Sequence, residues 1–333
     1  MMYHTLMEKE AAQTPEVIKQ QILANQPLVE KIGQKLRDIA PKMVMIIGRG
    51  SSDHAGVFGK YLIEIEAGIP VSSAAPSVAS VYGKTLKLDG ALVIVISQSG
   101  RSPDIIAQAK MAKEAGAYCI ALVNDEASPL KGIVDDFIGL KAGDEISVAA
   151  TKSYLSTLSA LVHLVASWTQ NNELLQGLKL LPEALDAIID SPVQLQPDAF
   201  LPVKNMVVLA RGLGFSVSKE MALKLKEVCA IHAEAFSSAE FLHGPVTLVE
   251  QGLVILNCTV EDETAYSHQQ QIADVTQRGA QIINLTQNGI AVHPRLAPFL
   301  VLQRFYLDIA KVAVKRGFNP DEPKGLKKVT RTL

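Results

Sequence analysis

Short, continuous runs of apolar residues alternate along the chain with segments of helical periodicity. In the first half the apolar runs predict strands near 43–48, 69–74, 91–97, 118–123 and 136–140. The segments between them predict helices near 53–66, 76–82, 103–115 and 128–134. Runs that are apolar throughout are typical of parallel strands covered on both faces. This half is therefore expected to be a doubly wound α/β domain.

The second half repeats the first at an offset of 162 residues. The segments 43–50 and 205–212 align, so that Arg49 falls on Arg211 and Gly50 on Gly212. At the same offset two further apolar runs match, 91–96 with 253–258 and 118–123 with 280–285. Because one offset aligns three runs without a gap, we infer two copies of one unit. The expected fold is α/β, with two tandem doubly wound parallel five-stranded sheets, each in a three-layer αβα sandwich.

Longer helical segments frame and join the two copies. They are predicted near 14–38, 152–170, 173–189 and 298–316, and the last precedes a basic tail, 319–333. The apolar run 155–168 contains His163 and is shorter than the roughly 20 residues of a membrane span, so it predicts a buried helix. The expected organisation is an N-terminal helical segment (1–38), a first domain (39–170), a helical linker (171–199) and a second domain (200–333).

Composition narrows the class of protein. With 48% hydrophobic and 20% charged residues the 333-residue chain is not disordered. The net charge of −2, from 32 basic and 34 acidic residues, disfavours nucleic acid and membrane surfaces as partners. Cys119, Cys229 and Cys258 form no CxxC pair, which suits a reducing cytoplasm. The seven histidines show no metal-binding spacing, so no metal is predicted.

Two predicted turns that follow strands are rich in hydroxyl groups. Residues 97–103 read SQSGRSP and open a predicted helix, where free N–H groups and the helix dipole favour an anion. The turn 48–53 adds Ser51 and Ser52. Since open parallel sheets bind ligands at the carboxyl ends of their strands, these turns predict a phosphate site; the alternative is a pair of ordinary serine-capped turns. The second copy has acidic residues at 259–263 instead, so one phosphate site is expected, in the first copy.

The helical segment 219–231 carries Glu220, Lys224 and Glu227 on one face. Its position after the first strand of the second copy favours a catalytic carboxylate, whose pKa would be tuned by Lys224 and by burial. The alternative is a solvated charged stripe. His243, in a turn broken by Gly-Pro, is either a surface residue or a residue at the edge of a site.

The basic tail allows two interpretations. Its cations are Lys324, Lys327, Lys328 and Arg331. They predict either a frayed, solvated end or a lysine that folds over the site to contact a phosphate or a carbonyl carbon.

Together these motifs resemble those of the tandem SIS-domain (sugar isomerase) family. The resemblance extends to the isomerase half of the glutamine–fructose-6-phosphate aminotransferases. Through SQSGRSPD (97–104) it also extends to the free-standing sugar-phosphate deaminases, including the glucosamine-6-phosphate deaminases of the second type. It covers nearly the whole chain. The matching segments are 6–18, GRGSSDHAG (48–56), SQSG (97–100), GDEISVAATKSY (143–154), ALKLKEVCAIHAEAF (222–236), EFLHGP (240–245) and DEPKGLKKVT (321–330).

The resemblance implies a role for each matching residue. The sugar-phosphate-binding positions are matched by Ser52, Ser97, Gln98, Ser99 and Ser102, with Ser51 beside them, and Val148 matches a backbone contact to the sugar. Glu227 matches the base that moves a proton between sugar carbons 1 and 2, and Lys224 its neighbour. His243 matches a ring-opening histidine supplied by the partner subunit, which implies a homodimer. Lys328 matches the tail lysine that engages the sugar carbonyl. No cofactor is implied.

The departures from the family pattern bear on the reaction. Ala150 and Arg101 stand where the aminotransferases usually have a serine and an acidic residue. The chain begins where the isomerase half begins, so we expect no glutaminase half to release ammonia. The expected activity is cytoplasmic deamination of glucosamine 6-phosphate, with water, to fructose 6-phosphate and ammonia. The alternatives are galactosamine-6-phosphate deamination, deglycation, plain aldose–ketose isomerisation, an aminotransferase-like isomerase, and a non-catalytic sugar-phosphate sensor.

Overall fold

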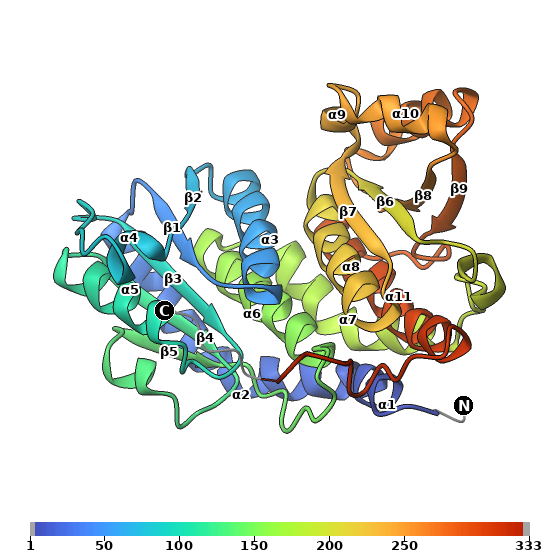
Figure 1. Ribbon diagram of the computed structural model, residues 1–333. Coiled ribbons are helices and arrows are strands. Elements are labelled where there is room, and N and C mark those ends of the chain that lie inside the picture. The colour runs from blue at the N-terminus through green and yellow to red at the C-terminus, as the bar shows by residue number, and fades with distance from the viewer. Residues whose placement is uncertain (1–3, 329–333) are drawn as a thin grey trace. The chain divides into compact units, whose positions relative to one another are not determined.

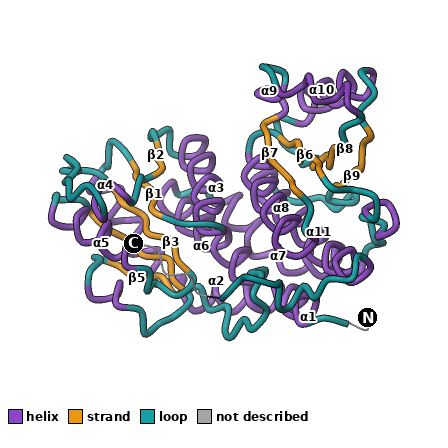
Figure 2. Tube along the Cα trace, in the orientation of Figure 1, coloured by secondary structure: helices purple, strands orange, loops and turns teal. Residues whose placement is uncertain are grey.

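The computed structural model describes residues 4–328, which form two compact units, each built around one parallel sheet (Figures 1 and 2). The first-repeat unit comprises 16–144 and 152–179. The second-repeat unit comprises the chain up to Pro15, the short segment Glu145–Thr151, and Leu180–Lys328. Each sheet coincides with one of the two predicted sequence repeats, which confirms the duplication.

The first-repeat unit contains a five-stranded parallel sheet with the order β2-β1-β3-β4-β5. Its strands are β1 (Val44–Ile47), β2 (Val71–Ser73), β3 (Leu92–Ser97), β4 (Tyr118–Val123) and β5 (Asp136–Gly139). Its helices are α2 (Thr14–Ile39), α3 (Ser51–Glu66), α4 (Ser77–Ser80), α5 (Pro103–Glu114), α6 (Lys152–Thr169) and the first part of α7 (Asn172–Asp190). All five predicted strands are confirmed.

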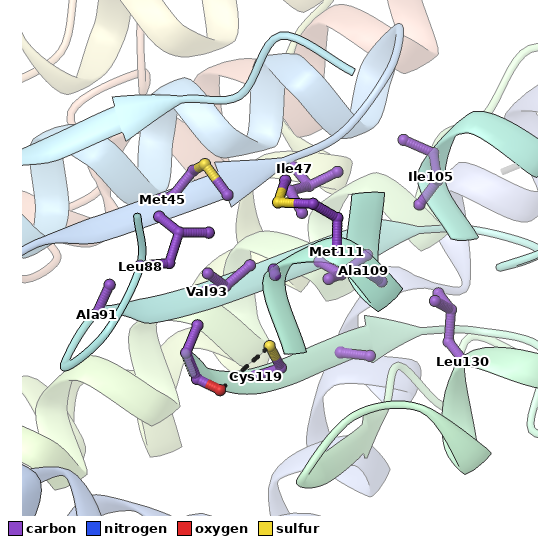
Figure 3. Packing of buried hydrophobic residues seen from close by; sticks show 14 of the residues in the cluster. Met45, Ile47, Leu88, Ala91, Val93, Ile105, Ala109, Met111, Cys119 and Leu130 are labelled. Carbon is purple, nitrogen blue, oxygen red and sulfur yellow. Dashed lines mark hydrogen bonds between the residues drawn. The ribbon is translucent and has the colours of Figure 1, made fainter. Parts of the chain in front are cut away.

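Alternation along the buried strands gives this sheet two apolar faces. One face presents Met45, Val93 and Cys119 to α5, in the cluster drawn in Figure 3. The opposite face presents Ile46 to α3 and α6. There a Cβ added to Gly56 of α3 would lie only 3.0 Å from Ile46 Cγ2, so the glycine allows the helix to approach closely. Helices on both faces give the predicted three-layer sandwich.

The second-repeat unit contains a four-stranded parallel sheet with the order β7-β6-β8-β9. Its strands are β6 (Asn205–Ala210), β7 (His232–Ser237), β8 (Val254–Cys258) and β9 (Gln281–Leu285). Its helices are α1 (Leu6–Ala12), α8 (Leu213–Cys229), α9 (Ser238–Phe241), α10 (Ala265–Gln277), α11 (Ala297–Lys315) and the remainder of α7. Phe241 of α9 and Val275 of α10 pack on one face of the sheet, while α8 lies against β6 and β7 and packs on α11.

The prediction of a fifth strand in the second sheet is wrong for the described residues. The counterpart of β5 at the repeat offset is 298–301, which forms the first turn of α11. Pro298 suits the first turn of a helix. From there to Ala313 the residues are mostly apolar and nearly all are buried, and the helix packs against α1 and α8. A long helix buries this segment more completely than an edge strand would.

Smaller differences concern helix type and capping. The helix predicted near 128–134 is a 3₁₀ turn, Pro129–Gly132, because Ser128 caps a short segment led by proline. Ser102 and Pro103 occupy the predicted first positions of α5, but the Ser102 hydroxyl makes no capping hydrogen bond to that helix. The predicted buried helix at 155–168 is confirmed within α6. None of the helices between residues 4 and 328 combines the length and apolarity needed to cross a bilayer.

Each unit buries one histidine almost completely. His163 on α6 is 4% exposed, and burial lowers its pKa to about 4. His268 on α10 is 2% exposed, and its Nε2 lies 2.8 Å from Asn257 Oδ1. Burial, aided by the charge of Arg211, lowers the pKa of His268 to about 4 as well. Both rings are therefore neutral in the folded protein at pH 7.

These histidines should make the protein acid-sensitive. Above the unfolded-state pKa of about 6.5 they contribute no pH dependence, since both states are uncharged. As pH falls from there toward about 4, only the unfolded chain takes up these protons, and each histidine removes about 1.4 kcal/mol of unfolding free energy per pH unit. Denaturant titrations between pH 7 and 4.5 should show a shallower loss for His163→Gln than for the wild type. Equal slopes for His163→Gln and the wild type would contradict the prediction.

Candidate functional site

The turn after β3 is held in one shape by hydrogen bonds within the first-repeat unit. The Gly100 amide donates to Ser97 Oγ at 2.9 Å, and the Gln98 carbonyl accepts from the amides of Asn124 and Asp125. Gly100 has φ +61°, and a side chain there would collide with Ser128 Oγ. The partly exposed Ser99 lies between these fixed points. The turn is thus a rigid, hydroxyl-bearing loop directly before the N-terminus of α5.

The turn after β1 lies next to it, because β1 and β3 are neighbouring parallel strands. Gly50 precedes α3 with φ +54° and ψ −128°, and Ser51 and Ser52 form the first turn of that helix. Arg49 Nε donates to Asp104 Oδ2 at 3.0 Å, which ties this turn to the start of α5. Asp104 is fully buried. The structure therefore brings together the two serine-rich turns that the sequence predicted as one phosphate site.

The two arginines of these turns are already paired with carboxylates of the same unit. Arg49 is paired with Asp104, and Arg101 with Asp125 at 2.8 Å. An anion bound here would therefore be held mainly by N–H groups, hydroxyls and the N-terminal ends of α3 and α5.

The second repeat keeps the backbone of the first turn but not its chemistry. Gly212 precedes α8 with φ +55° and ψ −131°, almost the values of Gly50. The turn after β8 carries Glu263, which makes a two-pronged ion pair with Arg295 at 2.7 and 2.9 Å. That hydrogen-bonded pair lowers the pKa of Glu263 to about 2. A carboxylate that stays charged does not favour phosphate, in agreement with the predicted asymmetry.

A buried charge cluster lies on α8 of the second-repeat unit. Lys224 Nζ is 3.1 Å from Glu220 Oε1 and 2.7 Å from Glu227 Oε2. The side chains of Lys224 and Glu220 are 1% and 0% exposed, whereas that of Glu227 is 19% exposed. Burial by itself would lower the pKa of Lys224, but the two carboxylates outweigh it and hold that pKa above its usual value. The solvated-stripe alternative does not fit this burial.

This arrangement leaves Glu227 as the accessible member of the cluster. Lys224 stays charged and pairs with both carboxylates. Glu220 is fully buried, whereas Glu227 is partly exposed to solvent. Glu220 belonged to the predicted helix face but was not among the predicted site residues, since spacing alone does not tell which carboxylate of a stripe is buried.

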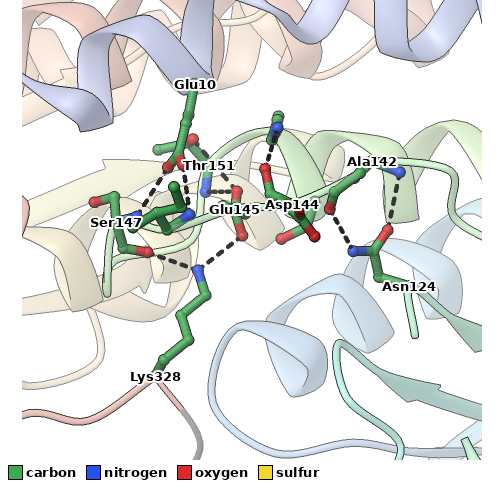
Figure 4. A network of polar contacts seen from close by, with 12 residues as sticks. Glu10, Asn124, Ala142, Asp144, Glu145, Ser147, Thr151 and Lys328 are labelled. Atoms are coloured by element: carbon green, nitrogen blue, oxygen red, sulfur yellow. Dashed lines mark hydrogen bonds and ion pairs between the residues drawn. The ribbon is translucent and has the colours of Figure 1, made fainter. Parts of the chain in front are cut away.

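The C-terminal segment lies against residues 145–151 of the same unit (Figure 4). Lys328 Nζ pairs with Glu145 Oε2 at 3.1 Å and donates to the Ser147 carbonyl at 2.6 Å. The amide of Val148 donates to the Asp321 carbonyl at 3.0 Å. Two predicted residues, Lys328 and Val148, therefore meet in one network. Glu145 was not predicted as a site residue; only its presence in the GDEISVAATKSY motif could have drawn attention to it.

The contacts do not connect every predicted residue. His243 is exposed just after α9, and its amide donates to the Glu240 carbonyl at 2.9 Å. Its imidazole makes no hydrogen bond or ion pair with any residue from 4 to 328. Arg331 of the predicted basic tail lies outside the described residues. Within the described chain, no three His, Cys, Asp or Glu side chains cluster in a way that would hold a metal ion.

Comparisons with known proteins agree with this division. The SIS domain family model matches residues 39–167 and 200–297. The glutamine–fructose-6-phosphate aminotransferase (isomerizing) of Clostridium acetobutylicum is 32% identical over 363 residues, covering 98% of this chain and 59% of that protein. The chain thus spans about three fifths of the length of this relative.

Several solved structures resemble nearly the whole chain. A candidate phosphosugar isomerase from Silicibacter pomeroyi is 37% identical, with a TM-score of 0.87 over 96% of this chain and 100% of that one. The C-terminal domain of glucosamine-fructose-6-phosphate aminotransferase from Francisella tularensis is 26% identical, with a TM-score of 0.81 over 96% and 99%. Glucosamine-6-phosphate deaminase from Thermotoga maritima is 21% identical and shares the fold, with a TM-score of 0.78 over 98% and 100%.

The two matched segments each contain one of the parallel sheets, and together they account for most of the chain. The chain therefore belongs to the SIS-domain family and is homologous to the isomerase half of glutamine–fructose-6-phosphate aminotransferase.

Proposed function

We propose that this protein is an amino-sugar-phosphate deaminase and isomerase that converts glucosamine 6-phosphate and water to fructose 6-phosphate and ammonia. The observation that carries the proposal is the α8 cluster, in which a buried lysine bridges a buried and an accessible carboxylate. A sugar-phosphate sensor has no need of such a group. The resemblance of residues 97–104 to the free-standing deaminases supports removal of the amine.

The serine-rich turns of the first-repeat unit would bind the phosphate. Ser97, Ser99 and Ser102 offer hydroxyls before α5, and Ser51 and Ser52 offer theirs at the start of α3. Gln98 adds a side-chain amide. Because hydrogen bonds to an ionised acceptor are stronger than neutral ones, several such donors can hold a phosphate without an unpaired cation.

Glu227 would move the proton that defines the reaction. In the open-chain aminoaldose it removes the proton from carbon 2 and returns it to carbon 1, which converts the aldehyde and amine into a hydroxymethyl group and a carbon 2 imine. Water then adds to the imine carbon and ammonia leaves, giving the ketose. Lys224 orients Glu227 through their ion pair at 2.7 Å, and the enolamine holds the electron pair without a cofactor.

The remaining predicted residues take supporting roles. His243 would transfer protons during ring opening in the site of a partner subunit, so we propose a homodimer. Its exposed imidazole, which makes no hydrogen bond or ion pair with residues 4–328, is consistent with this role. Lys328 would engage the sugar carbonyl, and Val148 would contact the sugar through its carbonyl, because its amide already donates to Asp321. The three buried free thiols suit the cytoplasm.

A second candidate is plain aldose–ketose isomerisation, in which the same base acts but no amine leaves. The likeness to the Silicibacter pomeroyi structure favours it. Ammonia release from a panel of amino-sugar phosphates, measured beside ketose formation from the matching aldose phosphates, separates the two reactions.

Removing hydroxyls from the turn after β3 should weaken substrate binding. Ser97→Ala and Ser99→Ala each remove a donor to a charged acceptor, worth about 1.5–3 kcal/mol, so KM should rise about tenfold or more. Thr259→Ala is the matched control, because Thr259 is the repeat counterpart of Ser97 in the other unit. Steady-state kinetics of the folded variants measure the effect. An unchanged KM in both serine variants would argue decisively against this phosphate site.

Glu227→Gln should abolish turnover while leaving affinity nearly intact. Glutamine keeps the size and the hydrogen bonding of the side chain but cannot accept the proton, and loss of a positioned base costs about 10²–10⁴-fold in rate. Loss of deuterium from carbon 2 of labelled glucosamine 6-phosphate should stop as well. Glu234→Gln, at an exposed position on β7, serves as the control. Wild-type ammonia release and label loss in the Glu227 variant would refute the mechanism.

The proposed role of His243 can be tested by subunit mixing. Glu227→Gln and His243→Ala should each be inactive as homodimers. A mixed dimer would contain one site with both native residues, so activity should return to about a quarter of the wild-type level after full random exchange of equal amounts. Differently tagged subunits report the exchange. No recovery in a proven mixed dimer would show that His243 does not act across the interface.

A further inference from the structure

We propose that Glu145 is the positioning residue for Lys328: it holds the lysine ammonium beside the segment that carries Val148. The role of the Lys328 amine in the reaction rests on the proposed function. The juxtaposition itself is a property of the second-repeat unit, and it can be tested without substrate.

Glu145 divides its two oxygens between the chain that supports it and the lysine. Oε1 accepts from the Thr151 amide at 2.9 Å, which fixes the carboxylate on its own loop. Oε2 lies 3.1 Å from Lys328 Nζ. The Glu145 side chain is 0% exposed and that of Lys328 25% exposed. Figure 4 shows Lys328 reaching from the C-terminal segment to this carboxylate and to the Ser147 carbonyl.

A buried carboxylate is costly unless it is paired and hydrogen-bonded. Glu145 therefore attracts the Lys328 ammonium more strongly than an exposed acid would. The Ser147 carbonyl, 2.6 Å from Nζ, fixes the direction of approach. These two acceptors, the Glu145 carboxylate and the Ser147 carbonyl, together restrict the long lysine side chain, whose rotamer freedom is otherwise large. The ammonium is thus held at one place on the loop 145–151.

The same loop is itself anchored, so that the position of Lys328 is defined relative to Val148. Glu10 of α1 accepts from the amides of Ile146 and Ser147. Asp321 accepts from the Met7 amide at 2.8 Å through its side chain and from Val148 through its carbonyl. The C-terminal segment is therefore attached at two points, Asp321 and Lys328. Only the second depends on Glu145.

The first test measures the reactivity of single lysines in the intact protein without substrate. Limited acetylation with acetic anhydride, followed by fragment mass spectrometry, gives a rate for each tail lysine. In the wild type Lys328 should react about tenfold more slowly than the exposed Lys327, because its ion pair with a buried carboxylate must break first. In Glu145→Gln the Lys328 rate should approach that of Lys327. Glu10→Gln loosens the loop but leaves the ion pair, so its Lys328 should stay slow.

Three results of this labelling would overturn the proposal. They are equal rates for Lys327 and Lys328 in the wild type, no acceleration in Glu145→Gln, or an equal acceleration in Glu10→Gln. The wild-type ratio needs no variant, so the test stands even where Glu145→Gln does not fold.

The second test asks whether Glu145 acts through Lys328 during turnover. Glu145→Gln should lower kcat more than KM, and it should cause no further loss in a Lys328→Met background, because residues that act as one unit are non-additive. Independent, additive losses would show that Glu145 acts by another route. Should the labelling agree while no amino-sugar phosphate is turned over, the proposed function fails and the positioning of Lys328 stands. If an amino-sugar phosphate is turned over but Lys328 is acetylated as fast as Lys327, the proposed positioning of Lys328 fails and the proposed function stands.

Discussion

Burial of both faces of a parallel sheet decides where polar chemistry can be placed in this protein. The strands β1, β3 and β4 are apolar and buried along nearly their whole length, so they cannot carry exposed functional groups. Polar side chains appear where these strands end. There the chain must turn sharply, and glycine at positive φ makes that possible at Gly50 and Gly100. The serine-rich turns are the consequence, and Arg49 and Asp104 fix one turn against the other.

The two repeats share a backbone conformation at equivalent turns but differ in the side chains around those turns. Gly50 and Gly212 keep almost the same dihedral angles at equivalent turns, because each must lead a buried strand into a helix. The side chains around them differ. One copy presents hydroxyls, and the other presents an acidic turn with Glu263 bound to Arg295 and a helix that carries Lys224. The repeated unit supplies the frame, and the side chains placed on that frame differ between the copies.

Charges removed from water must find partners, and the clusters around Lys224 and Lys328 follow from this rule. Lys224 is held by a buried and an accessible carboxylate, so that Glu227 is oriented rather than free. Lys328 is held by Glu145 and a backbone carbonyl, so that the C-terminal segment has a defined end point. In each case a fully buried acid fixes a lysine: Glu220 holds Lys224 beside Glu227, and Glu145 holds Lys328, which has a proposed role of its own. Positioning by buried acids therefore recurs on two separate elements.

The sequence by itself determined the parallel strands, the long helices, the duplication and the serine-rich turns, because apolar periodicity and turn chemistry are local properties. It did not determine that the apolar segment after Pro298 forms a helix rather than a fifth strand, since a short apolar run suits either and only packing against α1 and α8 selects one. Helical spacing alone did not distinguish Glu220 from Glu227, although the family resemblance pointed to Glu227, and nothing in the sequence singled out Glu145. Which carboxylate is buried and which lysine it meets depends on segments far apart in the chain, and only the tertiary structure brings those together.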